Sequence, residues 1–450
     1  MEAASRAAPS GLSRNVVVEL TAAVGAGIAV AVVGTLLPAV ARRGGIEPLG
    51  LAALGAAPFL ANVLGGFAGR VGARTPPGLA VHRVLGAAAL VPVVLAPVPL
   101  TIVAAAVVFW LSIAFTRPLQ VRLWGLVYPA SHRSRIVGLI GTATAGSAAL
   151  AALIGGLVAD RIGGPAAIAL CGLMAAAGAA SYTLLRAPAA DPARPYTIRS
   201  AVRSLQRRPR LRGALAAQAF YGGGLIAAGP LFTIVQVDRL DLSLGEIGLL
   251  GVATSLATTL SYIGWGALAD RHGGLAALRA GSVLGFAALA GYALAPHLAV
   301  LVVAALVLGL ANAAIDLGIT ALVGEETPLE ERAATMAGWN AIMGVRGLTV
   351  PFVASGLVQL GLLEVTPALL ACAAATGIGA ALYARLAGGE PVSAIAAAGA
   401  RAGFLAGGPL RSLRPAPRAL ARGTADLRRP WRPTRGSDRD AAVRGTRTRS

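Results

Sequence analysis

Three charged side chains lie deep within long apolar segments of this sequence. Arg117 and Asp316 stand well inside two such segments, and Arg346 stands near the middle of a third. Charges are costly to place in apolar surroundings, so residues of this kind usually bind a polar ligand, carry protons or pair with one another. We take Asp316 as the candidate for proton binding. The alternative is a structural ion pair of Asp316 with Arg117 or with Arg346.

Four further polar residues accompany these charges. Gln218 and Tyr221 begin the stretch "QAFYGGGLIAAGPLF", and Asn312 precedes Asp316 by four residues. Glu19 lies only a turn into the first apolar segment, where we expect solvation at a membrane interface. Arg83 and Arg279 stand near the starts of their segments, where we expect long side chains to extend to water.

The composition shows which elements must position these residues. Hydrophobic residues make up 56% of the 450 residues and charged residues 13%, whereas a soluble domain has about 25% charged residues. The chain therefore needs a lipid bilayer around it. It contains no lysine, which excludes a P-loop ATPase site. The two cysteines and four scattered histidines give no disulfide framework or metal site, and we expect no cofactor.

Apolar runs long enough to cross a bilayer predict twelve transmembrane helices. The expected spans are Val16–Val40, Leu49–Ala68, Leu79–Pro97, Leu100–Val127, Ile136–Ala159, Ala166–Leu185, Leu215–Val237, Ile247–Ala269, Leu275–Ala295, Leu298–Val323, Ala334–Leu360 and Pro367–Leu386.

Basic segments divide the chain and orient it. We expect an N-terminal segment (1–15), a six-helix half (16–185), a basic linker (186–213), a second six-helix half (214–386) and a disordered tail (387–450). The tail carries 13 arginines and three aspartates from residue 401 onward. Arginines in short loops favour the cytoplasmic side, which predicts that both termini are cytoplasmic and that the protein sits in the plasma (inner) membrane.

A repeated string reveals the internal architecture. "GGLVADRIGG" ends the fifth span and "WGALADRHGG" ends the eighth, while a weaker copy, "GGFAGRVGAR", ends the second. These copies mark units of three spans, and an odd number of spans inverts each unit relative to the next. The expected fold is an all-α polytopic membrane protein with two six-helix halves built from inverted three-helix repeats. The residues shared by the copies are Gly65, Gly69, Arg70 and Gly72; Gly156, Asp160, Arg161 and Gly163; and Gly266, Asp270, Arg271, Gly273 and Gly274.

The chain resembles the major facilitator superfamily over roughly residues 15–386. Gly266, Asp270, Arg271, Gly273 and Gly274 match that family's cytoplasmic-loop signature, whereas the first copy departs from it because Gly69 replaces the aspartate. The resemblance implies that the first, fourth, seventh and tenth spans line a central cavity, where Arg117 and Asp316 hold nearly equivalent places.

The resemblance also implies that Asp270 acts as a latch. In the family the loop aspartate contacts the other half, and here it would meet the positive N-terminus of the fifth span near Arg135–Gly138. The alternative is a motif that only sets the turn. Asp160 falls on the opposite side of the membrane, where we expect a duplicate of the motif or a contact of the outer gate.

The expected function is secondary active transport of a small solute by alternating access, and not catalysis. Proton-coupled efflux of a metabolite or drug-like compound is favoured because the expected cavity is apolar and sparsely charged. The alternative is a transporter-like receptor or scaffold that acts through the basic tail. The expected partners are the bilayer, the solute, protons and anionic lipid headgroups at the tail; we expect a monomer and no binding of nucleic acid.

Overall fold

The computed structural model describes residues 9–64, 73, 75–187 and 203–386, and within these ranges the regular structure is entirely helical. The first copy of the repeat, with Gly65, Gly69, Arg70 and Gly72, lies outside the described residues, as does the tail. Of the basic linker, only 186–187 and 203–213 are described.

The N-terminal half contains six membrane segments. Its elements are α1 (Pro9–Ala31), η2 (Val32–Leu36), α2 (Leu37–Arg43), α3 (Pro48–Leu64), α5 (Pro76–Ala88), η4 (Val91–Val94), α6 (Pro99–Val127), α7 (Ala130–Ile162), α8 (Gly164–Ala180) and η5 (Ser181–Leu184). The elements α1, η2 and α2 run on from one another as the first segment.

The C-terminal half repeats this arrangement. Its elements are α10 (Pro209–Ile234), η6 (Val235–Arg239), α11 (Leu244–His272), α12 (Gly274–Leu294), α13 (Leu298–Glu326), α14 (Leu329–Gln359) and α15 (Val365–Leu386).

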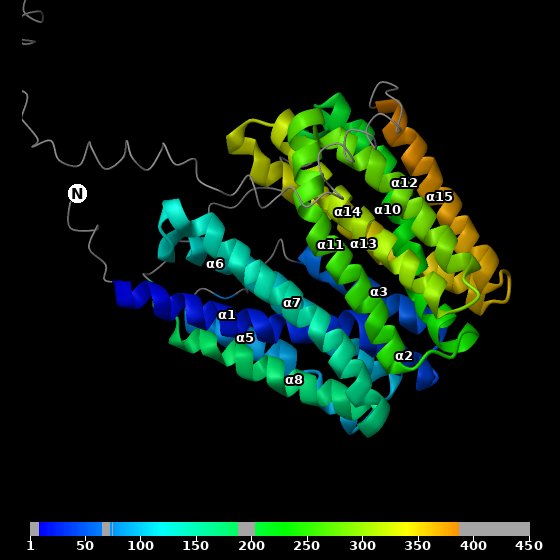
Figure 1. Cartoon of the computed structure of the whole chain (residues 1–450), viewed down its shortest axis with the longest axis horizontal. Coiled ribbons are helices and arrows are strands. Elements are labelled where there is room, and N and C mark those ends of the chain that lie inside the picture. Colours follow the sequence, from blue (N-terminus) through cyan, green and yellow to red (C-terminus); the bar gives the residue numbers. More distant parts are fainter. Residues whose placement is uncertain (1–8, 65–72, 74, 188–202, 387–450) are drawn as a thin grey trace, which may run out of the picture. The chain divides into compact units, whose positions relative to one another are not determined.

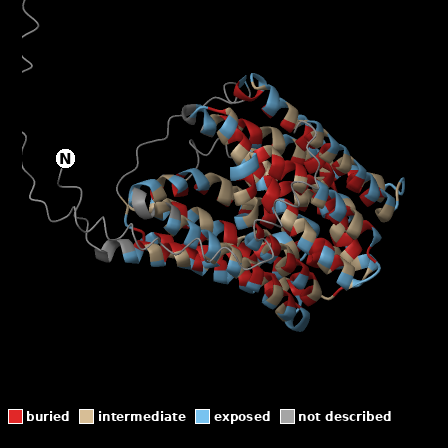
Figure 2. Cartoon of the chain, turned by 45° about the horizontal axis from the view of Figure 1, so that its top comes forward, coloured by how far each residue is buried: buried red, intermediate tan, exposed pale blue. Residues whose placement is uncertain are grey.

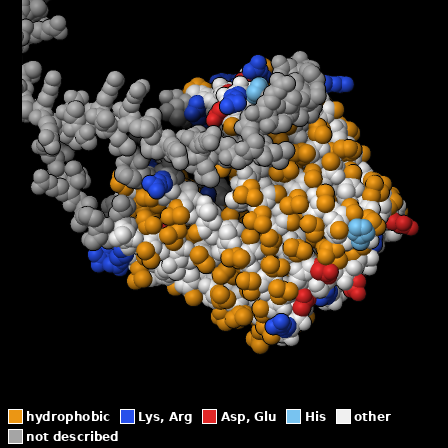
Figure 3. Space-filling view, in the orientation of Figure 1, with side chains coloured by type: hydrophobic (Ala, Val, Ile, Leu, Met, Phe, Trp, Pro, Cys, Tyr) orange, Lys and Arg blue, Asp and Glu red, His pale blue; other side chains and the backbone are white. Residues whose placement is uncertain are grey.

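Each of the twelve expected spans coincides with a helical segment where it is described, although the third, expected over Leu79–Pro97, is interrupted after Ala88 and its helical part ends at Val94. Eleven of the helical segments are long and apolar enough to cross a membrane. The twelfth, α3, is described only to Leu64, since its expected continuation to Ala68 lies outside the described residues. Hydrophobic side chains cover most of the face shown in Figure 3, and charged side chains gather near its edges. The chain is therefore an integral membrane protein with the all-helical fold expected from its sequence.

The two halves use the same helix pairings. In one half α1 packs on α8, α5 on α6 and α1 on α7; in the other α10 packs on α15, α12 on α13 and α10 on α14. Figure 1 shows α1, α5, α6, α7 and α8 gathered on one side and α10, α12, α13, α14 and α15 on the other. Between the halves, α7 packs on α11 and α3 on α14. Buried residues follow the inner faces of these helices (Figure 2).

Two segments contain a π-helical turn at corresponding places. The turn η2 (Val32–Leu36) contains Gly34 and precedes Pro38, and η6 (Val235–Arg239) follows Pro230 in α10. The missing N–H of a proline and the wide π-helical turn both interrupt regular helical hydrogen bonding. Both segments therefore depart from a regular α-helix at corresponding places.

Glycines permit the sharp turns that end α7 and α11. Gly163 has a φ of +90° and Gly273 a φ of +82°, and residues with a Cβ rarely adopt such values. In the second turn the backbone N–H of Gly274 donates to Glu325 at 2.7 Å, which satisfies one free donor at the start of α12.

The described end of the basic linker packs on the C-terminal half. Leu205 is fully buried, and Arg208 donates to Glu331 at 2.7 Å and to the carbonyl of Glu326. The hydrogen bond from Arg208 holds the pKa of Glu331 below its usual range, with a further hydrogen bond from Ser204. The described end of the linker is thus anchored to α13 and α14.

Candidate functional site

Asp160 joins the two halves of the protein at one end of the bundle. Its carboxylate oxygens accept hydrogen bonds from the backbone N–H groups of Leu244 and Gly245, each at 2.8 Å. These donors belong to the first turn of α11, where the helix dipole is positive and N–H groups lack partners within the helix. The carboxylate of one half therefore caps a helix of the other.

Four more polar contacts between the halves lie at this end of the bundle, which we call the Asp160 end. Arg42 forms an ion pair with Asp238 at 2.6 Å, and Arg43 donates to the carbonyl of Leu242. Gln359 accepts from the N–H of Leu49 and donates to Glu47. The sequence analysis missed these residues because loop charges near a membrane surface are common and their partners are far away in the chain.

Glycines bring α7 and α11 into close contact at the Asp160 end. A Cβ added at Gly156 would overlap the carbonyl oxygen of Leu244, and one added at Gly248 would overlap that of Ala152. Backbones can approach this closely only where side chains are absent. Gly156 therefore contributes to closing this end.

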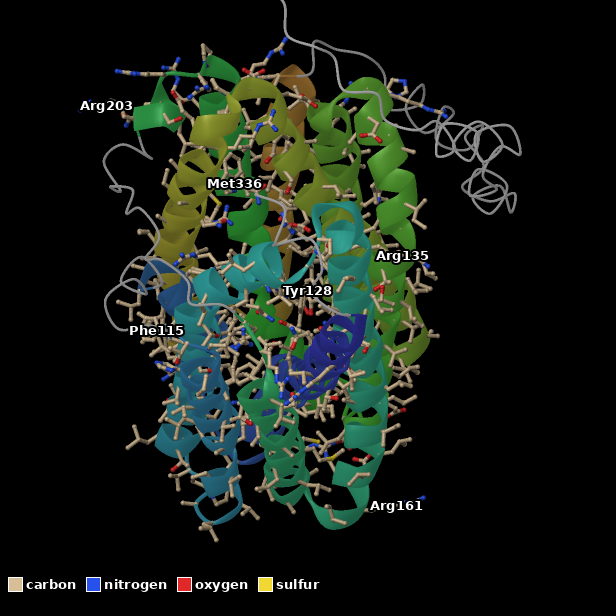
Figure 4. The ribbon with its side chains drawn as sticks, turned by 90° about the vertical axis from the view of Figure 1, so that its left-hand side faces the viewer. Phe115, Tyr128, Arg135, Arg161, Arg203 and Met336 are labelled. Carbon is tan, nitrogen blue, oxygen red and sulfur yellow. The ribbon has the colours of Figure 1, made fainter. Side chains whose placement is uncertain are left out.

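The opposite end, which we call the Asp270 end, shows no such contacts among the described residues. Within the described ranges, no hydrogen bond or ion pair joins the halves there, and Asp270 and Arg271 are exposed. A Cβ added at Gly266, the counterpart of Gly156, would meet no described atom within 4 Å. Arg135 and Arg161 mark the two ends of α7 in Figure 4. The expected contact of Asp270 with the start of α7 is absent from this conformation and stays a prediction.

A cavity of about 520 Å³ lies within the N-terminal half. Helices α1, α5, α6, α7 and α8 all contribute to its lining. The polar and aromatic residues that line it are Arg83, Phe109, Trp110, Ser112, Arg117, Gln120, Trp124, Thr144 and Tyr182. Its volume is in the range of small-molecule binding sites. A second cavity, of about 280 Å³, lies between α10, α14 and α15 and has an almost entirely apolar lining.

Glu19 is buried beside this first cavity, and its expected solvation at a membrane interface is wrong. The residue is 1% exposed, and its carboxylate accepts from the Tyr182 hydroxyl at 3.4 Å. Helix α1 begins at Pro9 and not at the start of the apolar run, so Glu19 lies several turns into the helix. Tyr182 is also the acceptor for the side-chain amide of Gln120 at 2.8 Å.

The three deep charges do not pair with one another. Asp316 is exposed on α13 and accepts from the Tyr262 hydroxyl at 2.8 Å, and the guanidinium of Arg117 lies 5.4 Å from the centre of the Trp124 ring. Arg346 donates to the backbone carbonyl of Gln218. The proposed ion pairs of Asp316 with Arg117 and with Arg346 are therefore both absent.

Gln218 and Tyr221 are buried within the C-terminal half. Gln218 accepts from the Tyr383 hydroxyl at 2.8 Å, and the Tyr221 ring meets the Tyr383 ring edge-on. Asn312 is exposed on α13. Neither Gln218 nor Tyr221 lines either cavity described above.

The two arginines expected to extend to water are held differently. Arg279 is only 5% exposed, and its Nε and one terminal nitrogen have no hydrogen-bond partner among the described residues. Arg83 donates to Thr116 at 2.6 Å and to Gln120 at 3.3 Å within the first cavity. Both helices place these arginines against neighbouring helices, which keeps the side chains from the membrane surface.

Two pseudo-equivalent helical halves, a contact network at one end and a cavity between helices define a polytopic membrane protein built from a structural repeat. Residues 214–435 match the family model described as Major Facilitator Superfamily. The C-terminal half of the chain is therefore similar to members of this superfamily.

Solved structures with this fold include several transporters. A mutant of the nucleoside transporter NupG has a TM-score of 0.70 at 12% identity, with 83% of this chain and 99% of that chain covered. The human organic anion transporter MFSD10 (TETRAN) has a TM-score of 0.56 at 16% identity, covering 83% and 99%. A bacterial homolog of the human lysosomal transporter Spinster, in an inward-facing and unoccupied conformation, has a TM-score of 0.59 at 14% identity, covering 84% and 96%. No curated protein sequence matches the chain.

Proposed function

We propose that the chain is a secondary active transporter that moves a small solute by alternating access. The observation that carries the proposal is the one-sided distribution of contacts between the halves. Asp160 and Gly156 hold one end together, while their repeat counterparts Asp270 and Gly266 make no such contact at the other within the described residues. In an inverted repeat, one engaged contact and one free counterpart support two alternative conformations, one closed at the Asp160 end and one closed at the Asp270 end.

The repeat also supports a specific contact for the other state. Asp160 and Asp270 are separated by a fixed number of residues in the chain. The same separation relates Leu244 and Gly245, the partners of Asp160, to Ser134 and Arg135 at the start of α7. In the state closed at the Asp270 end, the Asp270 carboxylate meets the start of α7 near Ser134 and Arg135. Arginine placement in the loops makes this end cytoplasmic, so the present conformation opens toward the cytoplasm.

The direction and coupling of transport follow as parts of the same proposal. Asp316, exposed on α13 next to Tyr262, binds the coupling proton, and the cycle exports a metabolite or drug-like compound across the plasma membrane. An acidic side chain inside a transmembrane segment commonly serves in proton relays.

The latch is tested by measuring the distance between the halves in two matched variants. Spin labels are attached to cysteines substituted for Leu126 and His272, on different halves near the Asp270 end, in a full-length background with Cys171→Ala and Cys372→Ala. A carboxylate at a helix N-terminus contributes up to about 2 kcal/mol, or about 30-fold in an equilibrium. We expect Asp160→Ala to shift populations toward the short distance by about this factor and Asp270→Ala to deplete it.

The control is Glu364→Ala, which removes an exposed carboxylate whose side chain makes no contact between the halves in the described structure. We expect this variant to retain the parent distances. Shifts of Asp160→Ala and Asp270→Ala in the same direction, or no shift in either, would contradict alternating access through these latches.

A further inference from the structure

The cavity of the N-terminal half carries an excess of positive charge. Arg83 and Arg117 line it, and no acidic side chain is among its described lining residues. Uncompensated charge in surroundings of low dielectric is costly, and a bound counter-charge removes that cost.

Arg83 is held in place with donors left over. Its Nε donates to Thr116 and one terminal nitrogen donates to Gln120, which fixes the plane of the guanidinium group. Neither partner carries a charge. An arginine has five N–H donors, so the remaining terminal nitrogen can donate to a ligand.

Arg117 is more accessible. It is exposed, and its contact in the described structure is with the face of the Trp124 ring, without an ion-pair or hydrogen-bond partner among the described residues. Stacking on an aromatic ring orients a guanidinium group and leaves its edge free for an oxyanion.

Glu19 does not cancel the charge of this pair. Its carboxyl is buried against Tyr182 and lies more than 4 Å from the Arg83 nitrogens, since the two form no ion pair. One positive charge remains in the cavity when Glu19 is ionised, and two remain when it is protonated. The preference for an anion therefore holds in either protonation state of Glu19.

The remaining walls fit an apolar body. Phe109 and Trp110 meet edge-on, with ring centres 5.3 Å apart, and small residues of α1, α7 and α8 complete the lining. A ring system packed there would have its acid group within reach of the arginines. The cavity volume of about 520 Å³ admits such a molecule.

We propose that this cavity binds an amphipathic organic anion, with its acid group on Arg83 and Arg117 and its apolar body against Phe109 and Trp110. The site lies within the N-terminal half alone. The inference rests on the proposed function, because it names the class of solute that the transporter carries.

The test compares three ligands that share a naphthylmethyl body and carry an anionic, a cationic or a neutral head group. Calorimetric titration of the purified full-length protein uses 1-naphthylacetate, 1-naphthylmethylamine and 1-naphthylmethanol. Hydrogen bonds to charged groups contribute about 1.5–3 kcal/mol, so we expect the acid to bind at least about tenfold more tightly than the amine and the alcohol. Equal affinities for the three, or no measurable binding of the acid, overturn the proposal.

Variants on α6 locate the site. Arg117→Gln is expected to weaken binding of the acid about tenfold or more, whereas Arg117→Lys keeps the charge and most of the affinity. Arg122→Gln removes a charge from the same helix outside the cavity lining and is expected to bind like the parent. Unchanged binding in Arg117→Gln overturns the proposal, and the ligand comparison on the unmodified protein stands even if that variant fails to fold.

The two proposals fail separately. If the three ligands bind with equal affinity while the label distances still shift in Asp160→Ala and Asp270→Ala, only the anion site is overturned. Anion-selective binding, together with label distances that do not change in Asp160→Ala and Asp270→Ala, overturns only alternating access.

Discussion

Glu19 and Gln218 hold matching positions in the two halves but differ in chemistry. Glu19 on α1 accepts from Tyr182, and Gln218 on α10 accepts from Tyr383, so the same tyrosine contact is built twice. A carboxyl group can exchange a proton and an amide cannot. The repeat has therefore kept the hydrogen bond in both halves while leaving an ionisable group in only one of these two pairs.

Asp316 is the residue for which a substitution has the sharpest expected effect on coupling. We expect Asp316→Asn to abolish accumulation of the transported solute driven by a pH gradient, because the amide cannot carry the proton. Flux measurements in proteoliposomes provide the readout. Tyr262→Phe serves as the control, since it removes the hydrogen bond to Asp316 and leaves the carboxyl in place. Unchanged gradient-driven transport in Asp316→Asn would rule out this role.

At the scale of elements, the crossing of α7 and α11 determines which end is closed. Both helices carry glycines at repeat-related positions, but in this conformation only those at the Asp160 end are in tight contact among the described residues. Such helix interfaces depend on small residues because there is little hydrophobic drive between helices in lipid. We therefore expect α7 and α11 to pack tightly at the Asp160 end or at the Asp270 end, but not at both ends in one conformation.

Alanine substitutions at Gly156 and Gly266 are expected to act in opposite directions. Gly156→Ala forces a Cβ against Leu244 and should destabilise the present state by about 1–3 kcal/mol. Gly266→Ala meets no described atom in this state and should stabilise α11 by about 0.5–1 kcal/mol through its lower backbone entropy. Thermal unfolding and the Leu126–His272 label distances check both changes. Equal effects of the two substitutions would show that the crossing does not distinguish the states.

At the scale of the whole molecule, the transporter and the receptor or scaffold hypotheses assign different roles to the basic tail. The described helical bundle contains the contacts of Asp160 and the cavity. The tail composition, rich in arginine, proline and glycine, suits attachment to anionic headgroups.

Truncation of the chain before Arg401 separates these roles. Because the described cavity and latches precede that residue, we expect the shortened protein to keep solute flux in proteoliposomes. Binding to vesicles that contain anionic lipid is expected to weaken through the loss of the arginines. A truncated protein that folds and binds solute but no longer transports it would favour the receptor or scaffold.

The sequence by itself determined the bilayer as the solvent, the helical segments and the inverted repeat. Segment length, the scarcity of charge and the spacing of the glycine–aspartate motif are local properties that a chain carries without its fold. It also singled out Asp160 and Asp270, since both follow the same pattern.

Only the tertiary structure decided which partners these residues meet. It placed the Asp160 carboxylate of α7 at the N-terminus of α11, and it gave Asp270 no hydrogen bond or ion pair with the described residues of the other half. It buried Glu19 against Tyr182 and separated Asp316 from both arginines. It also brought Arg83 and Arg117 to one cavity. The physical reason is that these contacts join helices far apart in the chain, so they depend on how the helices cross and on which end of the bundle is closed.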